Sequence, residues 1–600
     1  MRDPARAISV LVAVLLAGGA LAFDPGGWQV FLPAKWLVIT VCAFGAAAAA
    51  LFEGVDLHRR SLHGWASFLA WAAVTSLIAD DPLAAWLGTP DRRFGFVALL
   101  TLAAAFVGGQ AITDEKGRVL LSRAAIVALG GMTLYGIAES LGTVPVDLTT
   151  TTTRLGATFG SPAYLGAALC LLLPMGVGTA ADRRQPLRWR IAGATAAVCG
   201  IGLLAGSGAR AAAFGLGVTA LLAVLRGFDA LRRHPLVATG VVLVVVASIA
   251  LSPLGGRLGE PISGRLAEWR VASRALVSDP LTGTGLEGYR VVFPSHVDVA
   301  YVQEYGRTTI TDRAHSGPLD LGVAMGVPGT LAWVAAAVWL AIRCSGVVRG
   351  GTPVLAGMGA GVFALLTQEL FLFPTLEVGA AGWAIAGVVV ASARSQPPLH
   401  GRTKIGAAAT AALALLAATA GVIDVVADHR AASAVTNDDL VAADSAFALR
   451  PDSFRYALLA ADVALQRGDQ DGARDRVEAA AALSPPDPAV RIARARLAVA
   501  GADTSAALAL LEEAVEADPN HPELRILLGD VQAAAGKVGE AERSWLAAAH
   551  LSPADPTPHL RLAALYLAAG EADLARASLQ TARRLDPDHA AIADLEDALR

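Results

Sequence analysis

Charged residues are scarce in this chain of 600 residues, and so are cysteines and aromatic side chains. Asp, Glu, Lys and Arg together make up 17% of the sequence, whereas soluble domains carry about 25%. The hydrophobic share is 54% and the mean hydropathy is +0.53. Long apolar stretches of this kind must lie in lipid, so the composition excludes a purely soluble enzyme.

The few cysteines and the small net charge exclude further classes. The four cysteines fall inside apolar stretches without paired spacing, which argues against a disulfide framework and against a zinc site. A net charge of −4 gives no reason to expect a nucleic-acid partner. No Asp-x-Asp pair occurs in the outer loops between the predicted membrane spans, so we expect chemistry without a metal or another cofactor.

Before residue 425, apolar blocks alternate with short polar loops. A bilayer core about 30 Å thick needs roughly 20 helical residues. On this measure the sequence predicts an all-α, polytopic transmembrane bundle of about 12–13 spans over residues 1–425. The spans are expected near residues 7–23, 34–52, 62–79, 94–112, 119–138, 163–180, 191–207, 211–226, 235–252, 317–342, 353–374, 378–393 and 405–424.

The orientation follows from the basic residues of the short loops, which are enriched on the cytoplasmic side. With the N-terminus inside, eighteen Lys and Arg residues lie in inner segments and five in short outer segments. Thirteen spans then place the long loop 253–316 and the C-terminal region outside. The side on which the C-terminal domain lies depends on the last span: if 405–424 does not cross, the C-terminal domain is cytoplasmic.

Residues 427–600 repeat with a fixed period. Their prolines are spaced by 34 residues, at Pro451, Pro485, Pro519, Pro553 and Pro587. A glycine follows most of these prolines at 17 residues, at Gly468, Gly536 and Gly570. Such a period predicts an α-solenoid of stacked helical hairpins, and the pattern resembles the tetratricopeptide repeat. A general protein-interaction scaffold is the reading that we favour for this region.

The long loop ends in a pattern that could carry chemistry. It contains two histidines, His296 and His315. The pair His315-Ser316 is followed by nine residues and then by Gly326-Val327-Pro328-Gly329, which leads into a predicted span. We therefore expect the His315 imidazole at the outer membrane surface, with small residues that allow close packing one turn into the helix.

This pattern is similar to one in the O-antigen ligase and O-antigen polymerase superfamily, although Ala332 departs from it at the last position. The resemblance extends over roughly residues 80–335 and keeps its order along the chain. It includes the segments Trp86–Arg93, Arg154–Leu165, Gly206–Arg210, Arg265–Trp269 and Pro280–Gly285.

The resemblance implies a membrane glycosyltransferase of the bacterial cytoplasmic (inner) membrane, working in lipopolysaccharide or other surface-polysaccharide synthesis. Its donor would be a glycan on undecaprenyl pyrophosphate, and its acceptor lipid A–core, another lipid-linked glycan or a protein hydroxyl. His315 would be the general base. Arg210, Arg265 and Arg154 would bind the donor pyrophosphate, because guanidinium forks match its oxygens and arginine at a membrane edge is a functional candidate.

Several alternatives remain open at this stage. Within the superfamily, the chain could be an O-antigen or exopolysaccharide polymerase, or a protein O-oligosaccharyltransferase. Outside it, a polysaccharide-lipid transporter or a non-catalytic scaffold would also need a membrane domain. The clustering of polar features at one face argues against a transporter, and thirteen spans are more than a scaffold needs for anchoring. A protein partner for the repeats is also open.

The topology can be tested with reporter fusions. Alkaline phosphatase fused after residue 430 should be active, because it is active only outside the cytoplasm and the repeats are expected there. A fusion at residue 300 serves as the control and should also be active. An inactive reporter at 430 beside an active one at 300 would mean that segment 405–424 does not cross.

Overall fold

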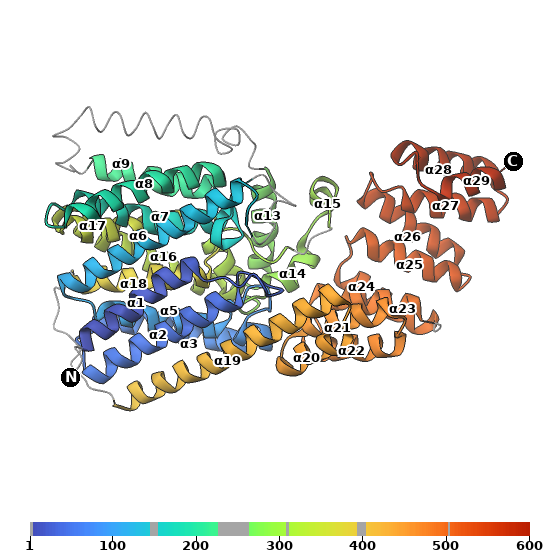
Figure 1. The fold of residues 1–600 in the computed structure, drawn as a ribbon. Coiled ribbons are helices and arrows are strands. Elements are labelled where there is room, and N and C mark those ends of the chain that lie inside the picture. The colour runs from blue at the N-terminus through green and yellow to red at the C-terminus, as the bar shows by residue number, and fades with distance from the viewer. Residues whose placement is uncertain are drawn as a thin grey trace.

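A computed structural model describes residues 4–144, 154–225, 263–307, 311–392, 404–501 and 504–599. Within these ranges the regular structure is helical and contains no strand, which confirms the predicted all-α class. Figure 1 shows a bundle of long helices, with smaller helix pairs projecting from one end of the bundle.

Helices occupy twelve of the thirteen predicted spans, and the thirteenth, 235–252, lies outside the described residues. Six of the described helices are long and apolar enough to cross a membrane: α2 (Pro33–Glu53), α6 (Glu115–Ser140), α7 (Pro162–Ala181), α8 (Leu187–Ser207), α16 (Gly317–Gly350) and α19 (Lys404–Asn437). The other six are α1 (Pro4–Leu21), α3 (Arg59–Leu77), α5 (Phe96–Gln110), α9 (Arg210–Leu225), α17 (Pro353–Gln368) and α18 (Leu376–Ser392).

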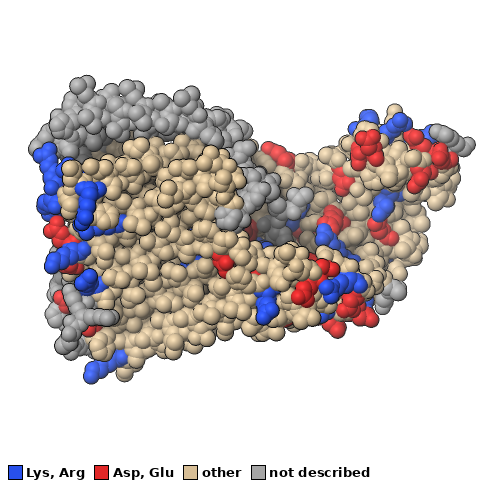
Figure 2. All heavy atoms as spheres, viewed as in Figure 1, with Lys and Arg blue, Asp and Glu red and all other residues tan. Residues whose placement is uncertain are grey.

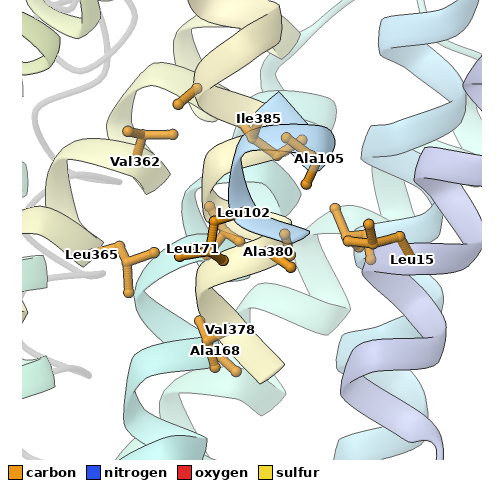
Figure 3. Packing of buried hydrophobic residues seen from close by; sticks show 14 of the residues in the cluster. Leu15, Leu102, Ala105, Ala168, Leu171, Val362, Leu365, Val378, Ala380 and Ile385 are labelled. Atoms are coloured by element: carbon orange, nitrogen blue, oxygen red, sulfur yellow. The ribbon is translucent and has the colours of Figure 1, made fainter. Parts of the chain in front are cut away.

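Helix α18 forms the centre of the bundle, and 14 of its 17 residues are buried. Figure 3 shows its residues Val378, Ala380 and Ile385 among side chains of α1, α5, α7 and α17. Glycines let the neighbouring helices approach to backbone contact: a Cβ on Gly109 of α5 would lie 1.9 Å from the Ala384 carbonyl oxygen of α18. Small residues at helix contacts are the usual means of close packing in membranes.

The surface of the bundle separates apolar from charged regions. The flank seen in Figure 2 is almost free of charged side chains. The bundle helices expose large apolar residues such as Phe52, Leu134 and Leu331. Basic residues gather at the end of the bundle that lies away from the repeats. Exposed ones come from the start of α3, the start of α6 and the turn between α7 and α8: Arg59, Arg60, Lys116, Arg183, Arg184 and Arg188.

The opposite end of the bundle carries the short elements. These are α4 (Pro82–Leu87), the 3₁₀ turn η1 (Ala157–Phe159), α13 (Ser263–Ser278), α14 (Tyr289–His296) and α15 (Val299–Tyr305). The last three belong to the predicted outer loop 253–316 and lie between the bundle and the repeats in Figure 1. Positions 253–262 and 308–310 of that loop are outside the described residues.

The repeat region is a stack of helical hairpins. Its helices are α20 (Leu440–Leu449), α21 (Phe454–Gln466), α22 (Gln470–Leu483), α23 (Pro488–Ala500), α24 (Thr504–Ala517), α25 (Pro522–Ala534), α26 (Val538–Leu551), α27 (Thr557–Ala568), α28 (Ala572–Leu585) and α29 (Ala591–Ala598). The glycines with the regular spacing, Gly468, Gly536 and Gly570, all have φ near +77°, a left-handed conformation that ends the first helix of each hairpin. Each periodic proline stands two residues after the end of a second helix.

The bundle and the repeats share one helix. Helix α19 continues without a break from Lys404 to Asn437, across the domain boundary that the sequence predicts near residue 425. Its buried Ala427, Ala431 and Ala434 pack with Tyr456 of the first repeats. The membrane helix therefore supplies part of the core of the solenoid.

The outer loop also contacts the ends of successive repeats. The buried Arg290 of α14 donates to both carboxylate oxygens of Asp487, at 2.5 and 3.1 Å. One repeat further, the Asn520 amide donates to the Val297 carbonyl at 2.8 Å. In the same repeat, the His550 carbonyl of α26 accepts a hydrogen bond from the loop residue Gln303, at 2.7 Å. The loop thus follows the repeats along their axis.

The Arg290–Asp487 pair should stabilise this contact. Asp487→Asn keeps the cap that this residue provides for α23 but leaves the buried Arg290 short of one negative partner. Breaking a buried pair costs about 3 kcal/mol or more, roughly a hundredfold shift toward separation of the loop and the repeats. Protease cleavage of the repeats in the full chain should accelerate accordingly.

The matched control is Asp530→Asn, which breaks the half-exposed pair with Arg561 inside the same solenoid. An exposed pair contributes only about 0–1 kcal/mol, so cleavage should change little. Equal cleavage rates for the two variants would show that the Arg290 pair does not hold the loop to the repeats.

Candidate functional site

His315 stands directly before α16, at the end of the bundle that faces the repeats. Its Nδ1 lies 3.1 Å from Oε2 of Glu268, and the same Oε2 accepts a hydrogen bond of 2.9 Å from Nη1 of Arg265. Arg265 and Glu268 are one turn apart on α13. The structure therefore brings together two of the residues predicted from the sequence, His315 and Arg265, through a carboxylate between them.

The electrostatics of this cluster favour an ionised Glu268. Burial opposes its ionisation, but the neighbouring His315 and Arg265 more than offset that penalty and hold the pKa of Glu268 below its usual range. The His315 side chain keeps 24% of its surface exposed. A substrate hydroxyl can therefore reach the imidazole.

The backbone around His315 is held in an unusual conformation. Its φ is +52°, in the left-handed region that residues other than glycine rarely adopt. The same holds for Arg93, Ala157 and Glu287, which lie in other loops at this end of the bundle. Such strained residues gather at functional sites, where the surrounding contacts must compensate for them. Here the Ala314 N–H donates to Oδ1 of Asp320 at 2.8 Å and fixes the turn.

Phe373, between α17 and α18, is a buried ring shared by His315 and two arginines. Its ring centre lies 5.3 Å from that of His315, 5.2 Å from the Arg92 guanidinium and 5.7 Å from that of Arg313. Both guanidiniums pair with carboxylates: Arg92 with Asp312 at 2.5 Å, and Arg313 with the two acids Glu287 and Asp320. These contacts fix the residues that lead into His315.

The pKa of the Asp312 carboxyl reports the same pairing. Burial opposes ionisation of Asp312, but the charge and the hydrogen bond of Arg92 hold its pKa below the usual range. The Arg92–Asp312 ion pair therefore fixes the segment just before His315.

Helices α9 and α13 share a second aromatic contact, Phe371. Arg210 begins α9, and Phe214, one turn later, packs on Phe371 with the ring centres 5.3 Å apart. On α13, Trp269 follows Arg265 by one turn, and its ring centre lies 6.1 Å from that of Phe371. The helices that carry Arg210 and Arg265 therefore meet at Phe371.

Arg154 supports this arrangement from the side. Its Nε donates to the Ser207 carbonyl at 2.7 Å, in the turn that leads into Arg210. Arg154 therefore contacts the chain at Ser207, three residues before Arg210.

The glycines of the family-like pattern create a close backbone contact below the site. Helix α16 is kinked at Met325 and Gly326, and Gly326 has φ +68°. The kink lets Val327 N–H donate to the Pro280 carbonyl and Thr284 N–H donate to the Val323 carbonyl, both at 2.8 Å. The Pro280–Gly285 and Gly326–Gly329 segments are thus two sides of one interface.

Sequence reasoning missed Glu268, Phe373 and Arg313. Glu268 had a usable signal, since it lies three residues after Arg265 inside a segment that the resemblance already covered. Arg313 also had a signal, since it lies two residues before His315, where the family-like pattern begins. Phe373 had no signal in the sequence, because its role depends on contacts between distant segments. Among the described residues, no three His, Cys, Asp or Glu side chains gather as a metal site would require.

Comparison with known families identifies part of the chain. Residues 195–334 match the model described as O-antigen ligase. This part of the chain is similar to the O-antigen ligase family. This range contains Arg210, Arg265 and His315, and Arg154 precedes it. Residues 498–544 match a tetratricopeptide repeat model, which confirms the repeat type predicted from the 34-residue period. No curated protein matches the chain.

Solved structures similar to this chain include several tetratricopeptide repeat proteins. YrrB, described as having an unusual peptide-binding site, is 22% identical over 28% of this chain and 86% of its own, with a TM-score of 0.25. A thermophilic repeat protein of Thermus thermophilus, TTC0263, is 24% identical over 28% and 92%, with a TM-score of 0.24. PilF of Pseudomonas aeruginosa is 16% identical over 32% and 88%, with a TM-score of 0.26.

The O-antigen ligase domain and the apolar helices together support a multi-pass membrane protein with a ligase-like role in glycan transfer. The tetratricopeptide repeats give it the capacity to bind other proteins.

Gly326→Ala tests the close contact below the site. A Cβ there would lie 2.2 Å from the Leu281 carbonyl oxygen. The alanine would also have to adopt the positive φ of this position, a backbone conformation that costs about 1–3 kcal/mol for a residue with a side chain. We expect a lower melting temperature of the detergent-solubilised chain. Gly346→Ala in the same helix is the control, because its Cβ would meet open space and alanine favours a helix by about 0.5–1 kcal/mol. A melting temperature equal to that of Gly346→Ala would contradict the close contact.

Proposed function

We propose that this chain is an O-antigen ligase-like glycosyltransferase at the outer face of the bacterial cytoplasmic membrane. It moves a glycan from an undecaprenyl-pyrophosphate donor to an acceptor hydroxyl on a lipid or a protein. The observation that carries this proposal is the Arg265–Glu268–His315 cluster inside the O-antigen ligase domain.

In this reaction His315 acts as the general base. A carboxylate beside Nδ1 favours the tautomer with its proton on Nδ1, which leaves the lone pair of Nε2 free. Nε2 takes the proton of the acceptor hydroxyl while that oxygen attacks the anomeric carbon of the donor. The bond from this carbon to the pyrophosphate breaks, and the pyrophosphate leaves with the electron pair. Glu268 stabilises the imidazolium that forms.

Arg210 and Arg265 neutralise the leaving pyrophosphate, and Arg154 helps to place Arg210. Helices α9 and α13, which carry the two arginines, meet at Phe371. Guanidinium groups can present parallel N–H groups to pyrophosphate oxygens, a geometry that lysine cannot reproduce. Arg265 keeps 41% of its side chain exposed, so it can turn from Glu268 toward a substrate.

The sidedness of the proposal is supported by two observations. The repeats contact the loop that carries the site, so both lie at the same end of the bundle. Exposed basic residues gather at the other end, as cytoplasmic ends do. We therefore place the repeats outside the cytoplasm, with α19 as the last crossing helix.

His315→Ala tests the function. Loss of a general base typically lowers a rate by about 10²–10⁴-fold, so transfer from the lipid-linked donor to the acceptor should fall by this factor in a reconstituted assay. A base is active when neutral, so the rate of the unchanged enzyme should rise with pH as the imidazole loses its proton.

His296→Ala is the matched control. His296 lies in the same loop on α14, where its ring contacts Ser278 and Ser295, so its loss should leave transfer unchanged. A rate that falls with rising pH would indicate a cationic His315 that binds pyrophosphate instead. Normal transfer by His315→Ala would overturn the assignment altogether.

A further inference from the structure

A pocket lies beside His315 that the proposed mechanism does not use. Loops at the repeat-facing end of the bundle line a cavity of about 140 Å³ that is partly open to solvent. One wall is Phe373, whose ring centre also lies 5.3 Å from that of His315. Four further aromatic residues line the space: Phe31, Phe94, Phe159 and Tyr164. We call this space the aromatic pocket.

The arginines and one of the acids that line the aromatic pocket are already neutralised. Arg92 pairs with Asp312 and donates to the Tyr164 hydroxyl. Arg313 pairs with Glu287 at 2.6 Å and with Asp320 at 3.3 Å.

The lining acid Asp91 likewise faces two arginines, one from α14 and one from the repeats: Arg290 and Arg455. These groups have little charge left for an ionic ligand, because separating a buried pair is costly.

Lys35 and Glu377 also line the pocket, and both can still form hydrogen bonds with a ligand. The buried Lys35 ammonium donates to the Ala22 carbonyl at 2.6 Å and approaches the Ala20 carbonyl at 3.5 Å, so one of its three N–H groups is left for a ligand. The Glu377 carboxylate makes no hydrogen bond or ion pair with any described residue. Its charge offsets that of Lys35.

We propose that the aromatic pocket binds a neutral pyranose ring of the glycan being transferred. This assignment rests on the proposed function. Pyranoses combine hydroxyl groups, which both donate and accept hydrogen bonds, with C–H faces that pack against aromatic rings. Glu377 accepts from the hydroxyls and Lys35 donates to them, while the aromatic walls cover the ring. Few polar groups on an apolar wall are typical of sites that orient a small ligand.

The charge balance of the pocket argues against pyrophosphate as its ligand. An anion would need cations without internal partners, and Arg92 and Arg313 both have carboxylates in contact. Phe373 lies between two parts of the site. On one side is His315, with the half-exposed Arg265 near it. On the other side is the aromatic pocket, whose lining charges are balanced. The pyranose could belong to the donor, as its first sugar, or to the acceptor.

Saturation-transfer NMR on the detergent-solubilised full chain tests the assignment without requiring turnover. The probes are methyl glucoside, methyl galactoside and methyl mannoside, with inorganic pyrophosphate as the competitor. At least one glycoside should receive saturation from the protein. Its affinity should fall about tenfold or more in Glu377→Gln, which loses a charge-assisted hydrogen bond. Pyrophosphate should not displace it.

Two variants complete the design. Thr375→Trp fills the pocket without breaking an ion pair, so it should abolish the signal even if Glu377→Gln is poorly folded. Glu115→Gln, at the exposed opposite end of the bundle, should leave binding unchanged. No signal in the unchanged chain, an equal signal in Thr375→Trp, or displacement by pyrophosphate would overturn the proposal.

Transfer kinetics then identify the source of the sugar. A raised KM for the lipid-linked donor in Glu377→Gln assigns the pocket to the first donor sugar, and a raised KM for the acceptor assigns it to the acceptor. Because binding is measured separately, a chain that binds glycosides but transfers nothing would contradict the proposed function and leave the pocket assignment in place.

Discussion

Buried arginines that must remain paired with carboxylates are the constraint on which the repeat-facing end of the molecule depends. Taking an ion out of water costs several kcal/mol, and an arginine left there without its partner is strongly destabilising. Arg290 illustrates the consequence, because its two acids come from different parts of the chain: Asp91 from the bundle and Asp487 from the repeats. The bundle, the outer loop and the solenoid can satisfy this arginine only when they are assembled together.

The same constraint reaches His315. Arg92 and Arg313 belong to the bundle end and to the outer loop, and their acids fix the segment that turns into His315 with a left-handed backbone. The repeats contact this loop from the other side through Asp487 and Asn520. A solenoid that is usually regarded as a docking surface for other proteins therefore also serves this chain internally. Its loop-facing edge is occupied, and any protein partner must use the rest of its surface.

The sequence predicted those features that depend on local periodicity or on residue type. Apolar blocks located the membrane helices, a 34-residue period located the repeats, and residue types near the membrane edge indicated His315 and Arg265. The contacts between distant segments could not be predicted this way. Phe373 comes from the α17–α18 turn, and nothing in its own neighbourhood connects it with His315. The continuous helix α19 was also missed, because composition changes near residue 425 while helical periodicity does not.

Exposure distinguishes the arginines that can serve a substrate from those that cannot. Arg313 is 6% exposed and contacts two acids, so releasing it would leave buried charges uncompensated. Arg265 is 41% exposed and has one acid three residues away on the same helix, a pair of the kind that contributes about 1 kcal/mol or less. A phosphate group can compete for Arg265 at little cost but not for Arg313. An arginine count at this end therefore overstates its anion-binding capacity, because buried arginines such as Arg313 and Arg290 keep their carboxylate partners.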